Sequence, residues 1–278
     1  MHGPRSLIVN GAVVDVPAQL DPIHTPLSRF LRARGLTGTK EGCAEGDCGA
    51  CTLAVASTDL DGQPTWRSVT SCIQPLASFL GREVVTAEGL ADNDSVDGGL
   101  HPVQAAMVRH LGSQCGYCTP GFVTSMFEGY ERAVVSVDDP AALADQLAGN
   151  LCRCTGYRPI REAMCHALSV RDAGVVDDEL VSIGGSRRCG KRAHHSIAST
   201  SHVEVDLSTD TSRYVRPTSL SALLTLKHDT KGLLLAGATE LGVLLRKRDA
   251  RWPLLIDTAA VAELQVLARA DVRADVVD

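Results

Sequence analysis

Residues 42–52 read Gly42-Cys-Ala-Glu-Gly-Asp-Cys-Gly-Ala-Cys-Thr52 and carry the most specific structural signal in this chain. With one later cysteine, the three cysteines of this loop give the spacing C-x4-C-x2-C-x20-C, the plant-type arrangement for a [2Fe–2S] cluster. The interleaved glycines let the backbone take positive φ and direct N–H groups towards sulfur. A structural zinc site is the alternative, but such sites normally use two C-x2-C pairs. The loop therefore predicts a cluster held by Cys43, Cys48, Cys51 and Cys72.

A second set of cysteines has the spacing C-x2-C-x33-C-x-C and comprises Cys115, Cys118, Cys152 and Cys154. The first pair alone is typical of a thioredoxin-like redox motif, but no βαβ pattern precedes it. Two close pairs at helix ends can converge on one metal centre, so we predict a second [2Fe–2S] cluster. We expect Thr119-Pro120 to cap the next helix. Three arginines can offset the charge of the cluster, although a solvated basic face is the alternative: Arg153, Arg158 and Arg161.

Composition excludes several classes of protein. The chain has 278 residues, a net charge of −6 and 44% hydrophobic residues, which are ordinary values for a globular protein of two or three domains. An acidic balance without a basic run argues against a nucleic-acid partner. Ten cysteines in a long chain without an export signal indicate metal ligation rather than disulfides; Cys165 is expected to be a buried, inert thiol and Cys189 a bystander. With no long apolar segment, we expect a cytoplasmic protein with no membrane contact.

The first 87 residues show the pattern of a small α+β domain. Residues 6–16 predict a hairpin that turns at Asn10-Gly11. A short helix is expected over residues 25–34, with Thr25 as its cap, Pro26 in its first position and Gly35 ending it. Further strands are expected at residues 51–56, 66–70 and 83–86.

The periodicity then becomes helical. Four helices are expected at residues 102–111, 120–133, 141–147 and 159–168, and the short links between them predict a compact bundle. Residues 171–210 lack a sustained period and are interpreted as a linker. After them a helix near residues 220–226, strands at 232–236 and 254–257, and a glycine turn at 237–242 indicate the beginning of an α/β unit.

Three motifs resemble the iron–sulfur signatures of the molybdenum hydroxylases, the xanthine dehydrogenase and aldehyde oxidase family: residues 42–52, Gln114-Cys-Gly-Tyr-Cys-Thr-Pro-Gly121 and Asn150-Leu-Cys-Arg-Cys-Thr-Gly-Tyr157. The resemblance implies an α+β chain with a ferredoxin-like β-grasp [2Fe–2S] domain at residues 1–87. A four-helix-bundle [2Fe–2S] domain would follow at 88–170, then the linker at 171–210, then the first part of an FAD-binding domain at 211–278.

The resemblance also extends to the flavin site. Arg216-Pro217 and residues 234–242 are similar to the start of the family's FAD domain, where the glycine turn wraps the flavin pyrophosphate; an ordinary strand-to-helix turn is the alternative. The cofactor-binding residues so implied are Leu234, Leu235, Ala236, Gly237, Ala238, Thr239, Glu240 and Leu241. Gln114 resembles the family glutamine that touches the pterin of a partner, with a polar residue at a helix end as the alternative. Because only one flavin segment is present, we expect the FAD site to be incomplete and the last unit to be loosely packed.

Clusters followed by a flavin segment on one chain resemble the iron–sulfur and flavin subunit of xanthine dehydrogenases within this family. The implied function is electron transfer from a molybdopterin centre on a large partner subunit, through two [2Fe–2S] clusters, to FAD and finally NAD, after hydroxylation of a purine. The alternatives are a stand-alone ferredoxin-like carrier, a zinc-stabilised interaction module, or the small subunit of another hydroxylase that acts on aldehydes or carbon monoxide.

Overall fold

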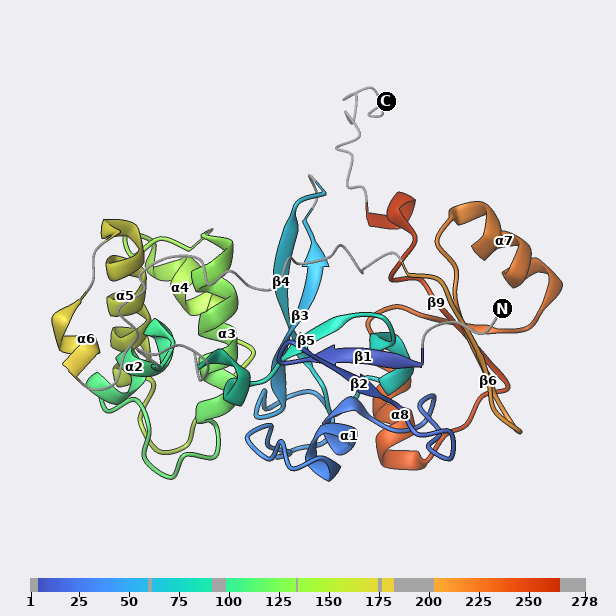
Figure 1. Ribbon diagram of the computed structural model, residues 1–278, viewed down its shortest axis with the longest axis horizontal. Coiled ribbons are helices and arrows are strands. Elements are labelled where there is room, and N and C mark those ends of the chain that lie inside the picture. Colours follow the sequence, from blue (N-terminus) through green and yellow to red (C-terminus); the bar gives the residue numbers. More distant parts are fainter. Residues whose placement is uncertain are drawn as a thin grey trace, which may run out of the picture.

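The computed structural model describes residues 5–59, 62–91, 99–133, 135–174, 177–182 and 203–265. They form three units: the sheet unit (residues 5–91), the helical unit (99–182) and the α/β unit (203–265). Figure 1 shows the sheet unit in the middle, with the helical unit on one side and the α/β unit on the other. None of the helices in the described ranges is long and apolar enough to span a membrane.

The sheet unit is built on five strands in the order β2-β1-β5-β3-β4. Their bounds are β1 Ser6–Val9, β2 Ala12–Asp15, β3 Thr52–Thr58, β4 Pro64–Thr70 and β5 Glu83–Val85. The predicted hairpin is confirmed, because β1 pairs antiparallel with β2 and both turn residues, Asn10 and Gly11, have positive φ (53° and 85°). The 3₁₀ helices η1 (Leu76–Phe79) and η2 (Ala87–Leu90) flank β5.

Helix α1 (Leu27–Ala33) begins later than the sequence predicts. Pro26 is extended and is itself the N-cap, without any side-chain capping bond, so the prediction of Thr25 as the cap is wrong. The carbonyl of Thr25 instead accepts a hydrogen bond from the backbone N–H of Leu76 (2.9 Å), which ties this segment to η1. Gly35 follows the helix with φ of 87°, as expected for a residue that ends it.

All four predicted helices of the helical unit are present, and a fifth was not predicted. Their bounds are α2 Pro102–Arg109, α3 Thr119–Arg132, α4 Pro140–Leu147, α5 Arg158–Ala173 and α6 Asp178–Ser182. The expected capping by Thr119 is wrong, because Cys118 is the N-cap of α3 and the Thr119 hydroxyl donates to Ser113 Oγ (2.8 Å).

The α/β unit has four strands in the order β6-β7-β9-β8, with both β7 and β8 parallel to β9. Its elements are β6 Val205–Ser208, β7 Arg213–Arg216, α7 Leu220–Asp229, β8 Leu233–Leu235, α8 Leu241–Arg248, β9 Leu254–Asp257 and η3 Ala262–Gln265. The segment interpreted as a linker, residues 171–210, therefore holds the end of α5, all of α6 and strand β6. Strand β6 was not predicted because its four residues are too few to show a sequence pattern. It forms by pairing with β7.

Both faces of the first sheet are covered, and β3 alternates between them. Ala54 and Ala56 pack into the core of the helical unit, whereas Leu53 and Val55 face a core that contains α1. Because both faces of β3 are buried, its apolar residues are continuous in the sequence instead of alternating with polar ones.

The second of these cores is shared with the α/β unit, so the expectation of a loosely packed last unit is wrong for the described residues. Tyr214 and Leu255 are fully buried in it. Arg216 is also fully buried and donates across the junction to the carbonyl oxygens of Ser78 (2.9 Å) and Leu80 (2.6 Å). Burial raises the pKa of Tyr214, so its phenol stays protonated and donates to Asp257. Residues 268–278 lie outside the described part of the chain.

Candidate iron–sulfur and flavin sites

The first cysteine set lies where the loop before β3 meets the residue pair after β4. Cys43 and Cys48 are half-buried on the loop, while Cys51 and Cys72 are each only 1% exposed. Ala44, Gly46 and Gly49 have positive φ, which folds the loop around its own sulfur atoms. That these four residues hold one cluster remains a prediction.

Backbone N–H groups point at the sulfur atoms of this loop. Cys48 N donates to Cys43 Sγ and Cys43 N to Cys48 Sγ (both 3.4 Å), and Glu45 N also reaches Cys43 Sγ (3.5 Å). Burial by itself raises the pKa of the Cys43 thiol, but these donors outweigh it and lower the pKa overall. A site that favours thiolate is a site prepared for metal ligation.

The four sulfur atoms form two pairs. Cys43 contacts Cys48, and Cys51 contacts Cys72; the second contact lowers the pKa of Cys51 and raises that of Cys72. Any of these thiols that still carries a proton must lose it when a metal binds.

The second set is paired in the same way. Cys115 and Cys118 lie between α2 and α3, and Cys152 and Cys154 lie between α4 and α5. A hydrogen bond from the Tyr117 backbone, then one from Cys154, lowers the pKa of Cys115, while the contact with Cys115 raises that of Cys154. Burial, then the contact with Cys152, raises the pKa of Cys118 to about 12.

Two pairs in each set fit a [2Fe–2S] cluster, whose two irons share four cysteine ligands. Among the described residues, no three His, Cys, Asp or Glu side chains are grouped to hold one metal ion. A structural zinc ion, the alternative, takes four ligands around one point.

One pocket of ≈ 200 Å³ brings the two sets together. Its cysteines come from both: Cys43, Cys48, Cys115, Cys118, Cys152 and Cys154. Three hydrogen bonds join the loops around it: Tyr117 Oη to the carbonyl of Glu41 (2.7 Å), Leu151 N to that of Cys48 (3.0 Å), and Asn150 Nδ2 to that of Gly49 (3.0 Å). The two predicted clusters are therefore neighbours, although the motifs alone suggest two separate sites.

Two glycines make this close approach possible. A Cβ on Gly121, in the first turn of α3, would overlap the carbonyl oxygen of Gly49, and a Cβ on Gly49 would overlap that of Gly149. Gly49 also has φ of 66°, which disfavours any other residue. The backbone of the helical unit thus touches the backbone of the first cysteine loop directly.

The predicted flavin segment lies on the other side of the first set. Leu235 and Ala238 are buried in the shared core, while Ala236, Gly237, Thr239 and Glu240 are exposed in the turn between β8 and α8. The backbone of α8 meets the first set at Gly242, where a Cβ would overlap the carbonyl oxygen of Ile73, next to Cys72. The predicted flavin residues are thus brought beside one cysteine set.

Basic residues of α8 also hold the first loop, and no sequence motif predicts this contact. Lys247 Nζ donates to the Cys43 carbonyl (2.9 Å) and pairs with Glu45 (3.1 Å), while Arg246 pairs with Glu41. The sequence does show basic residues in the last turn of a helix that follows a glycine turn. This pattern is too common in proteins to indicate a contact with the cysteine loop.

Several expected roles in the second set need correction. Arg158, expected to offset cluster charge, is 88% exposed and pairs with Glu162 one turn along α5 (2.8 Å), as the alternative of a solvated basic face predicts. Arg153 and Gln114 do line the shared pocket, whereas Arg161 lines another one. Cys165 is half-buried rather than buried. Cys189 lies outside the described residues.

Comparisons with known proteins agree with this geometry. A family described as "[2Fe-2S] binding domain" matches residues 86–165, and one described as "FAD binding domain in molybdopterin dehydrogenase" matches residues 208–276. The chain is 34% identical to xanthine dehydrogenase 1 of Arabidopsis thaliana over 94% of its length, and 42% identical to aldehyde oxidase 2 of Cavia porcellus over 58%.

Among solved structures, the aldehyde oxidoreductase of Desulfovibrio gigas matches 64% of this chain and 18% of that one, at 32% identity and a TM-score of 0.53. The chain spans 22% of the Arabidopsis protein and 12% of the Cavia protein, so it corresponds to a small part of each. From its two matched domains and these relatives, the chain belongs to the xanthine dehydrogenase and aldehyde oxidase family of molybdenum hydroxylases and carries that family's [2Fe–2S] and FAD-binding domains.

Proposed function

We propose that this chain conducts electrons from a molybdopterin centre on a large partner subunit through two [2Fe–2S] clusters to FAD, with NAD as the final acceptor. The observation that carries the proposal is the spatial order of the sites. Cys115 and Cys154 are exposed, the shared pocket lies between the two sets, and the flavin segment packs beside Cys72. When bound, the clusters and the flavin supply the electron-carrying chemistry.

The residues of the chain hold and tune these groups. We propose that Cys115, Cys118, Cys152 and Cys154 hold the cluster nearer the partner, and Cys43, Cys48, Cys51 and Cys72 the cluster nearer FAD. Two features set the reduction potential of the cluster nearer FAD. They are the burial of Cys51 and Cys72 and the N–H groups directed at Cys43. The backbone of residues 234–241 is proposed to bind the flavin pyrophosphate.

We further propose that residues 1–87 are a β-grasp domain, residues 88–170 a four-helix bundle, and the segment from 211 the start of an FAD domain. The strand order of the first sheet and the packing of α2 to α5 support the first two. A purine is the proposed substrate, since the similarity to a xanthine dehydrogenase extends over 94% of the chain. An aldehyde is the second candidate, because an aldehyde oxidoreductase shares the fold.

Replacing Gln114 tests the proposed route. Gln114 is exposed at the mouth of the shared pocket, on a loop that Tyr117 anchors to Glu41. In the complex with the molybdenum subunit, Gln114→Ala should slow bleaching of the clusters by xanthine about tenfold, which corresponds to the loss of one hydrogen bond of about 1.4 kcal/mol. Reduction by dithionite should be unchanged.

Gln63→Ala is the matched control for that experiment, because Gln63 is also exposed but lies in the β3–β4 turn. Equal slowing by xanthine and dithionite would indicate a damaged cluster and contradict the assigned role. A cluster-loaded protein that no molybdenum subunit can reduce would support the stand-alone carrier instead.

FAD binding gives a separate prediction. We expect this chain alone to lose FAD during gel filtration, because a dinucleotide must be enclosed by several segments and the turn at Gly237 is open to solvent. Fluorescence quenching should show weak binding that Gly237→Ala weakens further, since φ there is 66°. Stoichiometric FAD retained through the column would contradict this expectation.

A further inference from the structure

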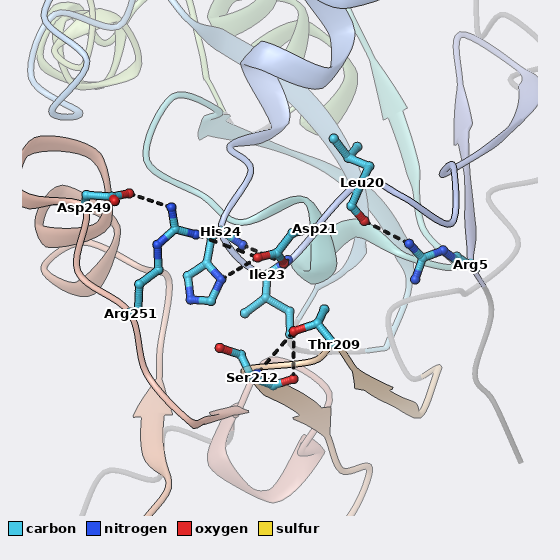
Figure 2. A network of polar contacts seen from close by, with 9 residues as sticks. All are labelled: Arg5, Leu20, Asp21, Ile23, His24, Thr209, Ser212, Asp249 and Arg251. Atoms are coloured by element: carbon cyan, nitrogen blue, oxygen red, sulfur yellow. Dashed lines mark hydrogen bonds and ion pairs between the residues drawn. The ribbon is translucent and has the colours of Figure 1, made fainter.

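A further pocket, of ≈ 210 Å³, lies between α1 and α8, away from the cysteines. Its lining is mostly basic and comprises His24, Pro26, Arg29, Leu245, Arg246, Asp249 and Arg251. Figure 2 shows the polar network on one side of it, where Arg251 reaches from the α/β unit towards Asp21 and His24 of the sheet unit. The pocket therefore sits on a junction between two units.

His24 is only 7% exposed, and one of its ring nitrogens is engaged. Nδ1 lies 2.8 Å from Asp21 Oδ2, whereas Nε2 is buried and has no partner among the described residues. A carboxylate accepts, so Nδ1 donates to Asp21, and in the tautomer that this bond selects Nε2 is an acceptor. A buried acceptor without a donor is costly, and a bound group that offers O–H would satisfy it.

Two guanidinium groups supply N–H donors, in contrast to the acceptor on His24. Arg246 pairs with Glu41 through one end, but its buried Nε has no partner in the described part of the chain. Arg29 is exposed on α1 and makes no ion pair or side-chain hydrogen bond with any residue in the described part of the chain. Both can donate to an anion in the pocket.

The acidic residues nearby are already engaged. Asp249 Oδ1 accepts from Arg251 (2.6 Å), and Asp21 contacts both His24 and Arg251, as the dashed lines of Figure 2 show. The atoms that still lack a partner are therefore His24 Nε2, which can accept from one O–H donor, and the N–H groups of Arg29 and Arg246, which can donate to anionic oxygens.

We propose that this pocket binds inorganic hydrogen phosphate, which carries both an O–H donor and anionic oxygens. Its P–O–H donates to His24 Nε2, while Arg29 and Arg246 donate to its other oxygens. The pocket is several times larger than the ~30 Å³ of one water, so a tetrahedral oxyanion has room. Bound there, the anion joins α1 of the sheet unit to α8 of the α/β unit.

This site is distinct from the proposed flavin site. The glycine turn precedes the first turn of α8, whereas the pocket is lined by its last residues, and a helix of eight residues is roughly 12 Å long. The proposal does not depend on the electron-transfer function, so the two can fail separately.

Calorimetry of the cluster-loaded chain with inorganic phosphate tests the proposal. We expect one phosphate per chain, at least tenfold weaker binding of sulfate, which has no proton to donate at neutral pH, and weaker binding of AMP, whose phosphate is esterified. Phosphate should also raise the midpoint of thermal unfolding. Equal binding of sulfate, tighter binding of AMP, or no binding at all would each overturn the assignment.

Variants distinguish a built site from general attraction to positive charge. Arg29→Gln should weaken phosphate binding about tenfold, and Arg248→Gln, which removes an equal charge from an exposed part of α8, should change it less than twofold. His24→Asn can keep the bond to Asp21 but removes Nε2, so it should abolish the preference for phosphate over sulfate. Equal weakening by Arg29→Gln and Arg248→Gln would refute the site.

Discussion

Cys48→Ser is expected to remove one of two [2Fe–2S] EPR signals from the reduced protein and leave the other, and Cys152→Ser to do the reverse. Each cysteine belongs to one of two pairs in its own set, so losing it leaves one iron with a single strong ligand. The iron content should fall from about four to about two per chain.

Cys165→Ala is the control, because this half-buried thiol packs against the helical core and has no cysteine partner among the described residues. It should leave both signals and the iron content unchanged. If either ligand substitution abolished both clusters while circular dichroism showed an intact fold, the division into two sets of four would be wrong.

Gly121→Ala is expected to destabilise this chain strongly although it adds a single methyl group. Its Cβ would overlap the carbonyl oxygen of Gly49, and a backbone atom cannot move aside as a flexible side chain can. We expect the free energy of unfolding to fall by about 3 kcal/mol, at the upper end of overpacking effects. Urea denaturation measures this loss.

Gly149→Ala is the matched control, since a Cβ there meets nothing within 4 Å. Its stability should stay within about 0.5 kcal/mol of the parent. In Gly121→Ala the two cysteine loops must separate, so any magnetic interaction between the reduced clusters should weaken while both signals persist. Equal stability of the two variants would show that the α3 contact with Gly49 is not tight.

The sequence predicts well those features that neighbouring residues determine. The Asn10-Gly11 turn and strand β9 follow from local chemistry, and β9 has the bounds expected. Both cysteine motifs are also local, which is why they can be read without a structure. The cap of α1 was missed because the chain around Thr25 is fixed by η1, about fifty residues away.

The common pocket of the two sets could not be predicted for a similar reason. It depends on Tyr117 reaching Glu41 and on Asn150 reaching Gly49, contacts that join residues 76 and 101 positions apart. The same holds for Arg216, which is bonded to Ser78 at a separation of 138 residues. Neither periodicity nor spacing carries information about such pairs.

The shared core has a consequence for the synthesis of this protein. Strand β5 leaves the ribosome about 170 residues before β9, which completes the core on which it depends. At roughly 5 to 20 residues per second, the sheet unit waits roughly 9 to 34 seconds for the α/β residues of this core, covered on that face only by its own α1 and η1. During the same interval Cys51 and Cys72 are not yet covered by Val243, which packs over them in the finished fold. Cys51 and Cys72 are therefore less covered during synthesis than in the finished fold.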